Sequence, residues 1–202
     1  MVVFKNKTTY LLTLAYSGPV ALLLSVGSWL PTYYNEVFQL PMAKASNIVG
    51  MLNFVGIAAA ICGMVLPAKV GLRRPFFIVP GFIVGIAGLG SILINNLPVI
   101  YISTMLLGAC IWVFLPSLIT LPMELPGMDP KQVAMIVGVV FAIGNAFGFI
   151  APIIVGYLRD ATGSYLPGLF LWSIISFSLA ISGLLLPETG PKGQKTVARP
   201  NN

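Results

Sequence analysis

Charged side chains are scarce in this sequence. Its 11 Lys or Arg and 5 Asp or Glu residues amount to 8% of the 202 residues, whereas soluble domains carry about a quarter. A soluble domain of this size needs a polar surface, and so few charges cannot cover one. Since 57% of the residues are hydrophobic, the surface must face lipid. The sequence therefore indicates a membrane protein.

Histidine is absent, which excludes imidazole general-base catalysis and His-ligated metal sites within the chain. None of the five acidic residues falls in the middle of an apolar run, so no proton relay is visible and any coupling residue must lie in a partner. No Lys or Arg lies there either, which argues against an anion clamp made by this chain alone. We expect no enzyme activity, no metal and no cofactor. The acidic residues are Glu36, Glu124, Asp129, Asp160 and Glu188.

What the sequence does contain is six apolar segments, each close to the ~20 residues that a helix needs to cross a bilayer. Continuous rather than alternating hydrophobicity favours helices over barrel strands. The predicted fold class is an all-α membrane protein with six transmembrane helices. Asp129 and Pro130 predict the start of the fifth helix, as a capping residue and a first-turn proline. The apolar segments are 11–30, 48–66, 76–94, 97–121, 133–158 and 166–186.

The basic residues divide unequally between the two sides of the membrane. Six spans place both termini on one side, which holds nine of the Lys and Arg residues, while Lys44 and Arg159 lie on the other. The positive-inside rule then predicts a protein of the cell membrane with both termini in the cytoplasm. The formal net charge of +6 is explained by this topology, and we expect no nucleic-acid partner because the charges form no stripe.

Small residues recur every fourth position in the fifth span, at Gly144, Gly148, Pro152 and Gly156. This spacing places all four on one helix face, which allows close contact with another helix. Two interpretations stay open. The row is a packing seam, or it is a hinge or gate, because Pro152 removes a backbone hydrogen bond.

Polar and aromatic residues inside the spans are candidates for binding a solute. Asn53 and Asn145 are amides at membrane depth, and Tyr101 and Trp112 follow helical spacing along the fourth span. An amide in hydrocarbon needs a partner or water, so each Asn either faces an aqueous pathway or bonds another helix. Aromatic residues near span ends are often interfacial anchors. Whether Trp29, Tyr33 and Tyr34 at the outer end of the first span are only such anchors stays open at this point.

The loop after the second span resembles the signature loop of the major facilitator superfamily, which reads Gly-x-x-x-Asp-Arg-x-Gly-Arg-Arg. Lys69, Gly71 and Arg73, followed by Arg74, fit this pattern within residues 63–75. Ala68 stands in place of the acidic residue, which argues against a charge-latched gate at this loop. Further pieces in matching order are Trp29-Leu-Pro-Thr-Tyr33, Glu124-Leu-Pro-Gly127, Gly156-Tyr-Leu-Arg-Asp160 and Pro187-Glu-Thr-Gly190.

Together these pieces resemble helices seven to twelve of a transporter similar to the cyanate and nitroimidazole group. The resemblance implies two three-helix repeats, and the pairs Trp29 with Trp112 and Gly71 with Gly163 agree with such a repeat. It also implies that residues 1–190 form a six-helix bundle, followed by a cytoplasmic tail at 191–202. The first, second, fourth and fifth spans would border a central cavity, with the third and sixth facing lipid.

Such a half would carry a small solute by alternating access only when a second six-helix bundle completes the pathway. The chain is then a fragment, a split-gene subunit or a half-sized protein that pairs with itself. A membrane structural or interaction protein that transports nothing is the alternative function. The expected partners are the lipid bilayer, a second bundle and a small-molecule solute.

Overall fold

A computed structural model of the chain describes residues 7–192, so the predicted tail at 191–202 lies almost wholly outside the described residues. Over that range the chain is helical, without strands, and six helices or helix pairs are long and apolar enough to span a membrane. This confirms the predicted fold class, and the protein is a multi-pass membrane protein. The spans are α1 (Lys7–Glu36), α2 (Met42–Val70), α3 (Pro75–Leu93), α4 (Leu97–Val113) with α5 (Leu115–Thr120) and the 3₁₀ turn η2 (Leu121–Glu124), α6 (Pro130–Thr162), and α7 (Leu166–Ile175) with α8 (Ser178–Leu185).

Local sequence signals set several helix ends. The Asp129 carboxylate accepts a hydrogen bond of 2.7 Å from the backbone N–H of Gln132 and caps α6, as predicted. Gly71 and Gly163 end α2 and α6 in the left-handed conformation, with φ of 72° and 75°. Only glycine adopts this geometry without a steric cost. The same cap therefore closes the second helix of each three-helix repeat.

Two spans are broken, where the apolar runs had predicted continuous helices. The fourth changes from α4 to α5 at Phe114, just before Pro116, which lacks the N–H that would continue the helix. The sixth changes from α7 to α8 at Ser176 and Phe177. There the Ser176 hydroxyl donates to the Ser173 carbonyl at 2.7 Å, a local bond that competes with helix geometry.

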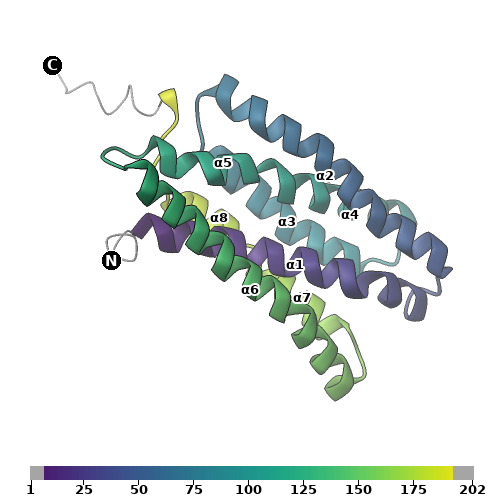
Figure 1. Cartoon of the computed structure of the whole chain (residues 1–202). Helices are drawn as coiled ribbons and strands as arrows, with labels where there is room; N and C mark the ends of the chain where they lie inside the picture. The colour runs from purple at the N-terminus through teal and green to yellow at the C-terminus, as the bar shows by residue number, and fades with distance from the viewer. Residues whose placement is uncertain (1–6, 193–202) are drawn as a thin grey trace.

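Each three-helix repeat packs its helices against those of the other repeat (Figure 1). The first span of one repeat lies against the second span of the other: α1 packs most extensively with α6, and α2 with α4. The third spans meet each other, as α3 lies against α7 and α8. This arrangement is consistent with half of a major facilitator fold, which nests such repeats in each half.

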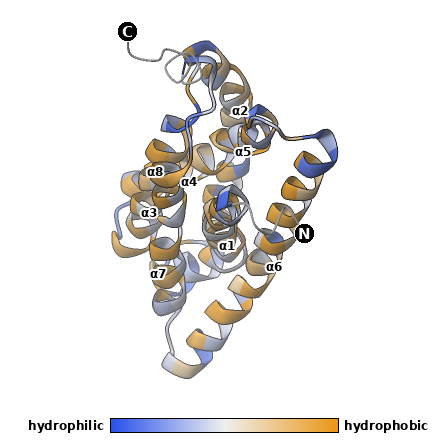
Figure 2. Ribbon diagram, turned by 90° about the vertical axis from the view of Figure 1, so that its left-hand side faces the viewer, coloured by the Kyte–Doolittle hydropathy of each residue, from blue (hydrophilic) through white to orange (hydrophobic). Residues whose placement is uncertain are grey.

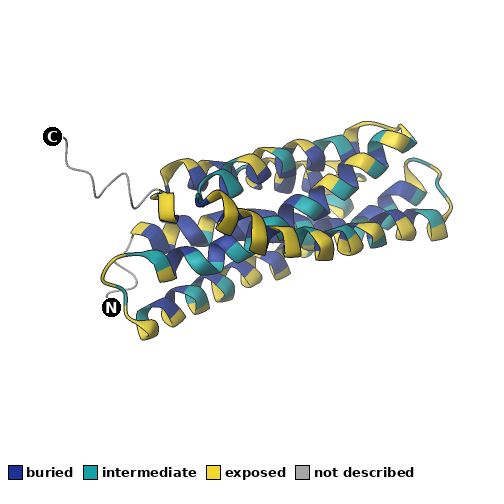
Figure 3. Ribbon diagram, turned by 90° about the horizontal axis from the view of Figure 1, so that it is seen from above, coloured by how far each residue is buried: buried dark blue, intermediate teal, exposed yellow. Residues whose placement is uncertain are grey.

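Hydrophobic residues predominate along the helices on all sides of the bundle (Figure 2), and many large ones are exposed, such as Phe54 and Phe149. The spans differ in burial, since 67% of the apolar window of α1 is buried against 33% for α2 and 22% for α6. Exposed residues run along the outer faces of these long helices (Figure 3). Thus α1 is the central helix, and α2 and α6 are the two that present most of their length to the surroundings.

The two tyrosines at the end of α1 are buried inside the bundle. Tyr33 and Tyr34 are 2% and 0% exposed. Their hydroxyls donate to the carbonyl oxygens of Ile92 at 2.7 Å and Ser91 at 2.9 Å. They therefore join α1 to α3 inside the core, because a buried tyrosine hydroxyl finds a protein acceptor. Of the two open interpretations, that of interfacial anchors therefore does not apply to Tyr33 and Tyr34.

Candidate functional site

A cavity of about 380 Å³ opens between four helices. The first, second, fourth and fifth spans line it, which are the four that the resemblance places around a central pathway. The lining combines an apolar wall with a few polar groups, as small-molecule sites usually do. Its residues are Tyr16, Val20, Leu23, Leu24 and Gly27 of α1, Val49, Leu52 and Asn53 of α2, Trp112 of α4 and Asn145 of α6.

Two amides stand in this cavity on opposite helices. Asn145 accepts a hydrogen bond of 3.3 Å at its side-chain oxygen from the hydroxyl of Tyr16. The Tyr16 ring fits there because Gly144 has no side chain, and a Cβ at that position would overlap the ring. The Asn53 side chain makes no hydrogen bond to any residue within 7–192. Both amides are exposed in the six-helix bundle, so each can bind a further molecule.

Trp112 and Trp29 occupy related places but differ in hydrogen bonding. Each ring lies against a glycine of the second helix in the other repeat, Trp112 on Gly56 and Trp29 on Gly156. The Trp29 indole donates to the Pro152 carbonyl oxygen at 2.8 Å. The Trp112 indole N–H is buried without an acceptor among the described residues. A buried donor without a partner is costly, and this N–H lies against Gly56 of α2.

The structure brings three of the four predicted solute-binding residues together and leaves one outside. Asn53, Trp112 and Asn145 line the cavity, whereas Tyr101 packs against the core cluster at the other end of α4. Tyr16 is the residue that sequence reasoning missed. It is 8% exposed and sits in an apolar stretch, so only the spatial neighbour Asn145 reveals its role.

The row of small residues in α6 faces α1 along its length. A side chain at Gly148 would meet Val20 and Leu24, and one at Gly156 would meet Trp29. The carbonyls of Ala151 and Pro152 accept hydrogen bonds from Trp172 at 3.2 Å and from Trp29 at 2.8 Å. The two indoles therefore hold α6 at Pro152 and the residue before it, where the proline has no N–H for the helix's own hydrogen bonding.

Charged groups gather at the end of the bundle that carries Lys7 and Lys192. Arg73 of the signature loop forms a salt bridge of 2.6 Å with Glu124, which follows the fourth span. The side chain of Glu188 accepts from the backbone N–H groups of Arg73 and Arg74 at 2.6 and 3.1 Å. The Arg74 guanidinium donates to the carbonyls of Gly183 and Leu184 at the end of α8. Carboxylates from two distant parts of the chain thus bind the loop that contains Arg73 and Arg74.

Gly71 and Lys69, the other two residues that fit the loop motif, lie at the end of α2. Gly71 provides the turn, and its carbonyl oxygen accepts from the backbone N–H of Lys192 at 3.1 Å. Lys69 lies in the last turn of α2, where a cation complements the helix dipole. The loop therefore ties the second span to the end of the sixth.

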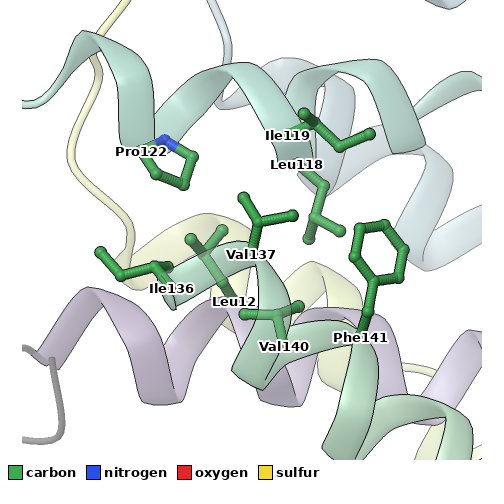
Figure 4. Close-up of a pocket in the computed structure, with 8 residues that line it drawn as sticks. All are labelled: Leu12, Leu118, Ile119, Pro122, Ile136, Val137, Val140 and Phe141. Carbon is green, nitrogen blue, oxygen red and sulfur yellow. The ribbon is translucent and has the colours of Figure 1, made fainter. Parts of the chain in front are cut away.

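Two other hollows are apolar. Side chains of α1, α5, η2 and α6 converge around a gap with no room for a water molecule (Figure 4). A groove of about 670 Å³ between η2 and the start of α6 is lined by residues such as Met123, Met128 and Val133. Neither presents a charged side chain, and no cluster of acidic residues and cysteines able to hold a metal occurs in residues 7–192. The cavity with the two amides is therefore the candidate site.

Known proteins provide a limited comparison. No protein-family profile matches the chain. Two proteins of Agrobacterium vitis, each named "Putative tartrate transporter", are 30% identical over 190 residues and 28% identical over 192 residues. These alignments cover 92% and 93% of this chain but 40% and 42% of the relatives. The chain is thus homologous to proteins named as transporters, and it spans about two fifths of their length.

Proposed function

We propose that this chain is the carboxy-terminal half of a major facilitator superfamily transporter. It would move a small solute by alternating access together with a second six-helix bundle. Support comes from the transporter names of its relatives and from the exchanged packing of its two repeats. Membership of the cyanate and nitroimidazole group is a finer proposal, which rests on the loop motifs alone.

The observation that carries this proposal is the composition of the cavity. Asn53, Asn145, Tyr16 and Trp112 bring hydrogen-bonding groups to one place among helices that are otherwise apolar. Polar groups inside a membrane are costly unless they serve a partner, water or a ligand. A protein that only held other proteins in the bilayer would have no need for a polar hollow of this size.

The exposed faces of α2 and α6 support the proposal of a second bundle. Apolar side chains such as Phe54, Ile57 and Phe147 are 77%, 64% and 49% exposed beside the cavity amides. One half offers only one wall of a pathway, because rocking needs a second bundle to rock against. The uncovered three fifths of the relatives is long enough to provide that bundle. A second copy of this chain is the other candidate.

Membrane orientation is part of the proposal. Six described Lys and Arg residues lie at the end of the bundle where α1 begins, and Lys44 and Arg159 lie at the other. The positive-inside rule then puts the Arg73 and Glu124 pair on the cytoplasmic side of the plasma membrane. In α6, Pro152 with the small residues Gly144, Gly148 and Gly156 would let the helix bend during gating.

Uptake into proteoliposomes tests the function. The chain is co-expressed with the part of an Agrobacterium vitis relative that it does not match, and radiolabelled tartrate is supplied outside. We expect accumulation by the pair, reduced at least about tenfold by Asn145→Ala, because a ligand group then loses its partner. A pair that binds stably but accumulates no tartrate, while the intact relative does, would contradict the proposal for this solute.

A further inference from the structure

We propose that this half of the cavity recognises the hydroxyl groups of a solute through Tyr16, Asn53, Trp112 and Asn145, and that Tyr16 determines this specificity. The proposal rests on the proposed function and deepens it. It assigns a solute class to this chain: small molecules with neighbouring hydroxyls on an apolar carbon frame. The cavity residues of this chain do not recognise the carboxylate groups that a solute carries.

The lining carries no charge. Its polar members are one phenol, two amides and one indole, and the six other lining residues are aliphatic side chains or glycine. A carboxylate moved from water to such a place would lose its hydration without meeting a cation, which costs far more than moving a neutral hydroxyl. The cavity is therefore matched to an uncharged part of the solute.

The polar groups of the lining include both donors and acceptors. Tyr16 donates to the Asn145 oxygen across 3.3 Å, which is long for an O–H···O bond, whose usual length is about 2.7–2.8 Å. A solute hydroxyl can donate to Asn145 and accept from the Tyr16 hydroxyl or from an amide N–H₂, since a hydroxyl has both capacities. A carboxylate can only accept, so it could take the Tyr16 hydroxyl as a donor but would leave the Asn145 oxygen without one.

Trp112 adds a donor that the protein does not use. Its counterpart Trp29 has its N–H satisfied by the Pro152 carbonyl, whereas the Trp112 N–H has no acceptor within residues 7–192. The two indoles also meet their glycines by different edges, since Trp112 contacts Gly56 through the edge that carries its N–H and Trp29 contacts Gly156 through its six-membered ring. A solute oxygen reached by a turn of the indole away from Gly56 would supply the missing acceptor.

The apolar part of the lining fits the carbon frame of the same solute. Val20, Leu23 and Leu24 form one wall, and the cavity holds about 380 Å³, near the lower end of the range for ligand sites. Four-carbon polyols and hydroxy acids have C–H groups for this wall and oxygens for the four polar residues. Larger solutes would have to extend beyond the chain into the second bundle.

Three matched probes separate hydroxyl from carboxylate recognition. Tartrate has two central hydroxyls and two carboxylates, threitol keeps the hydroxyls without the carboxylates, and succinate keeps the carboxylates without the hydroxyls. Each radiolabelled probe is equilibrated with the purified chain in detergent, and its dissociation constant is measured. We expect threitol to bind within about threefold of tartrate and succinate at least about tenfold more weakly, the loss expected for two hydrogen bonds.

Variants assign the preference to residues. Tyr16→Phe removes one oxygen and should bring the threitol affinity to that of succinate, and Trp112→Phe should lower it severalfold. Tyr157→Phe changes the same atom on an exposed residue outside the cavity and should leave all three constants unchanged. Far-UV circular dichroism and the melting temperature show that each variant is folded.

The outcomes also separate this proposal from the function on which it rests. Succinate binding as tightly as tartrate, absence of threitol binding, or a Tyr16→Phe variant with the parent's preference overturns the hydroxyl assignment, even where the paired bundles transport tartrate. Threitol binding by the chain in the absence of any uptake by the pair would leave the assignment standing and count against transport.

Discussion

Arg73 and Glu124 form a salt bridge of 2.6 Å across 51 positions of sequence. Their side chains are only 12% and 22% exposed, and the guanidinium Nε also lies 3.1 Å from both carboxylate oxygens. Thr189 donates to the same carboxylate at 2.9 Å. One carboxylate thus connects the loop after the second span, the end of the fourth span and the chain after the sixth.

Glu124→Gln should therefore destabilise the bundle. The variant leaves Arg73 partly buried without its counter-charge, and we expect a loss of about 1–3 kcal/mol, below that of a fully buried pair because some solvent reaches it. Thermal unfolding in detergent measures the loss. Asp160→Asn is the matched control, since its partner Arg159 and its own side chain are exposed at 43% and 75%, and its melting temperature should match the parent's.

Gly148→Leu should disrupt the contact between α6 and α1. Even a Cβ at this position lies against Val20 and Leu24, and overpacking of this kind costs about 1–3 kcal/mol in soluble cores. Gly138→Leu is the control on the same helix, because no atom lies within 4 Å of its added Cβ. Equal melting temperatures for the two variants would show that the Gly148 face does not touch α1.

The two related tryptophans should differ in their effect on stability. Trp29→Phe removes the donor to the Pro152 carbonyl, and the lost hydrogen bond adds about 0.5–1.5 kcal/mol to the cost of the smaller ring. Trp112→Phe loses the same ring volume but no hydrogen bond within the described residues. We expect the Trp29 variant to melt at the lower temperature, and the reverse order would refute the assigned donor.

Cysteine labelling determines the orientation of the chain in the membrane. After replacement of Cys62 and Cys110 by alanine, Lys44→Cys should react with an impermeant thiol reagent in intact cells, and Lys131→Cys should react only after permeabilisation. The charge distribution gives this order. Labelling of position 131 in intact cells with protection of position 44 would invert the topology.

Much of this fold can be predicted from the sequence, because hydrophobic length alone decides what crosses a bilayer. The capping pair Asp129 and Pro130 predicted the start of α6. Gly71 and Gly163 were paired only as members of an internal repeat, and the structure shows that both are helix caps. Pro116 did not by itself mark the break at Phe114, because other prolines such as Pro19 and Pro152 lie inside unbroken helices. The break at Ser176 has no signal in hydropathy, since an apolar run has the same hydropathy whether its helix bends or continues.

The candidate site was less predictable for a different reason. Asn53 and Asn145 attract attention because an amide is costly in hydrocarbon, but Tyr16 becomes visible only when α1 and α6 lie together. Tyr101 shares the helical spacing of Trp112 and still faces the core. The partner of Arg73 was equally hidden, because Glu124 and Glu188 come from distant loops and not from the motif at Ala68.

Transport by a completed pathway is the most direct test of the central claim. Tartrate uptake is measured in proteoliposomes that contain this chain alone, at a density where crosslinking shows only monomers, and in vesicles that also contain the complementary part of the Agrobacterium vitis relative. The account predicts accumulation in the second preparation and none in the first, because one half provides one wall of the pathway. Accumulation by the monomeric chain would contradict it.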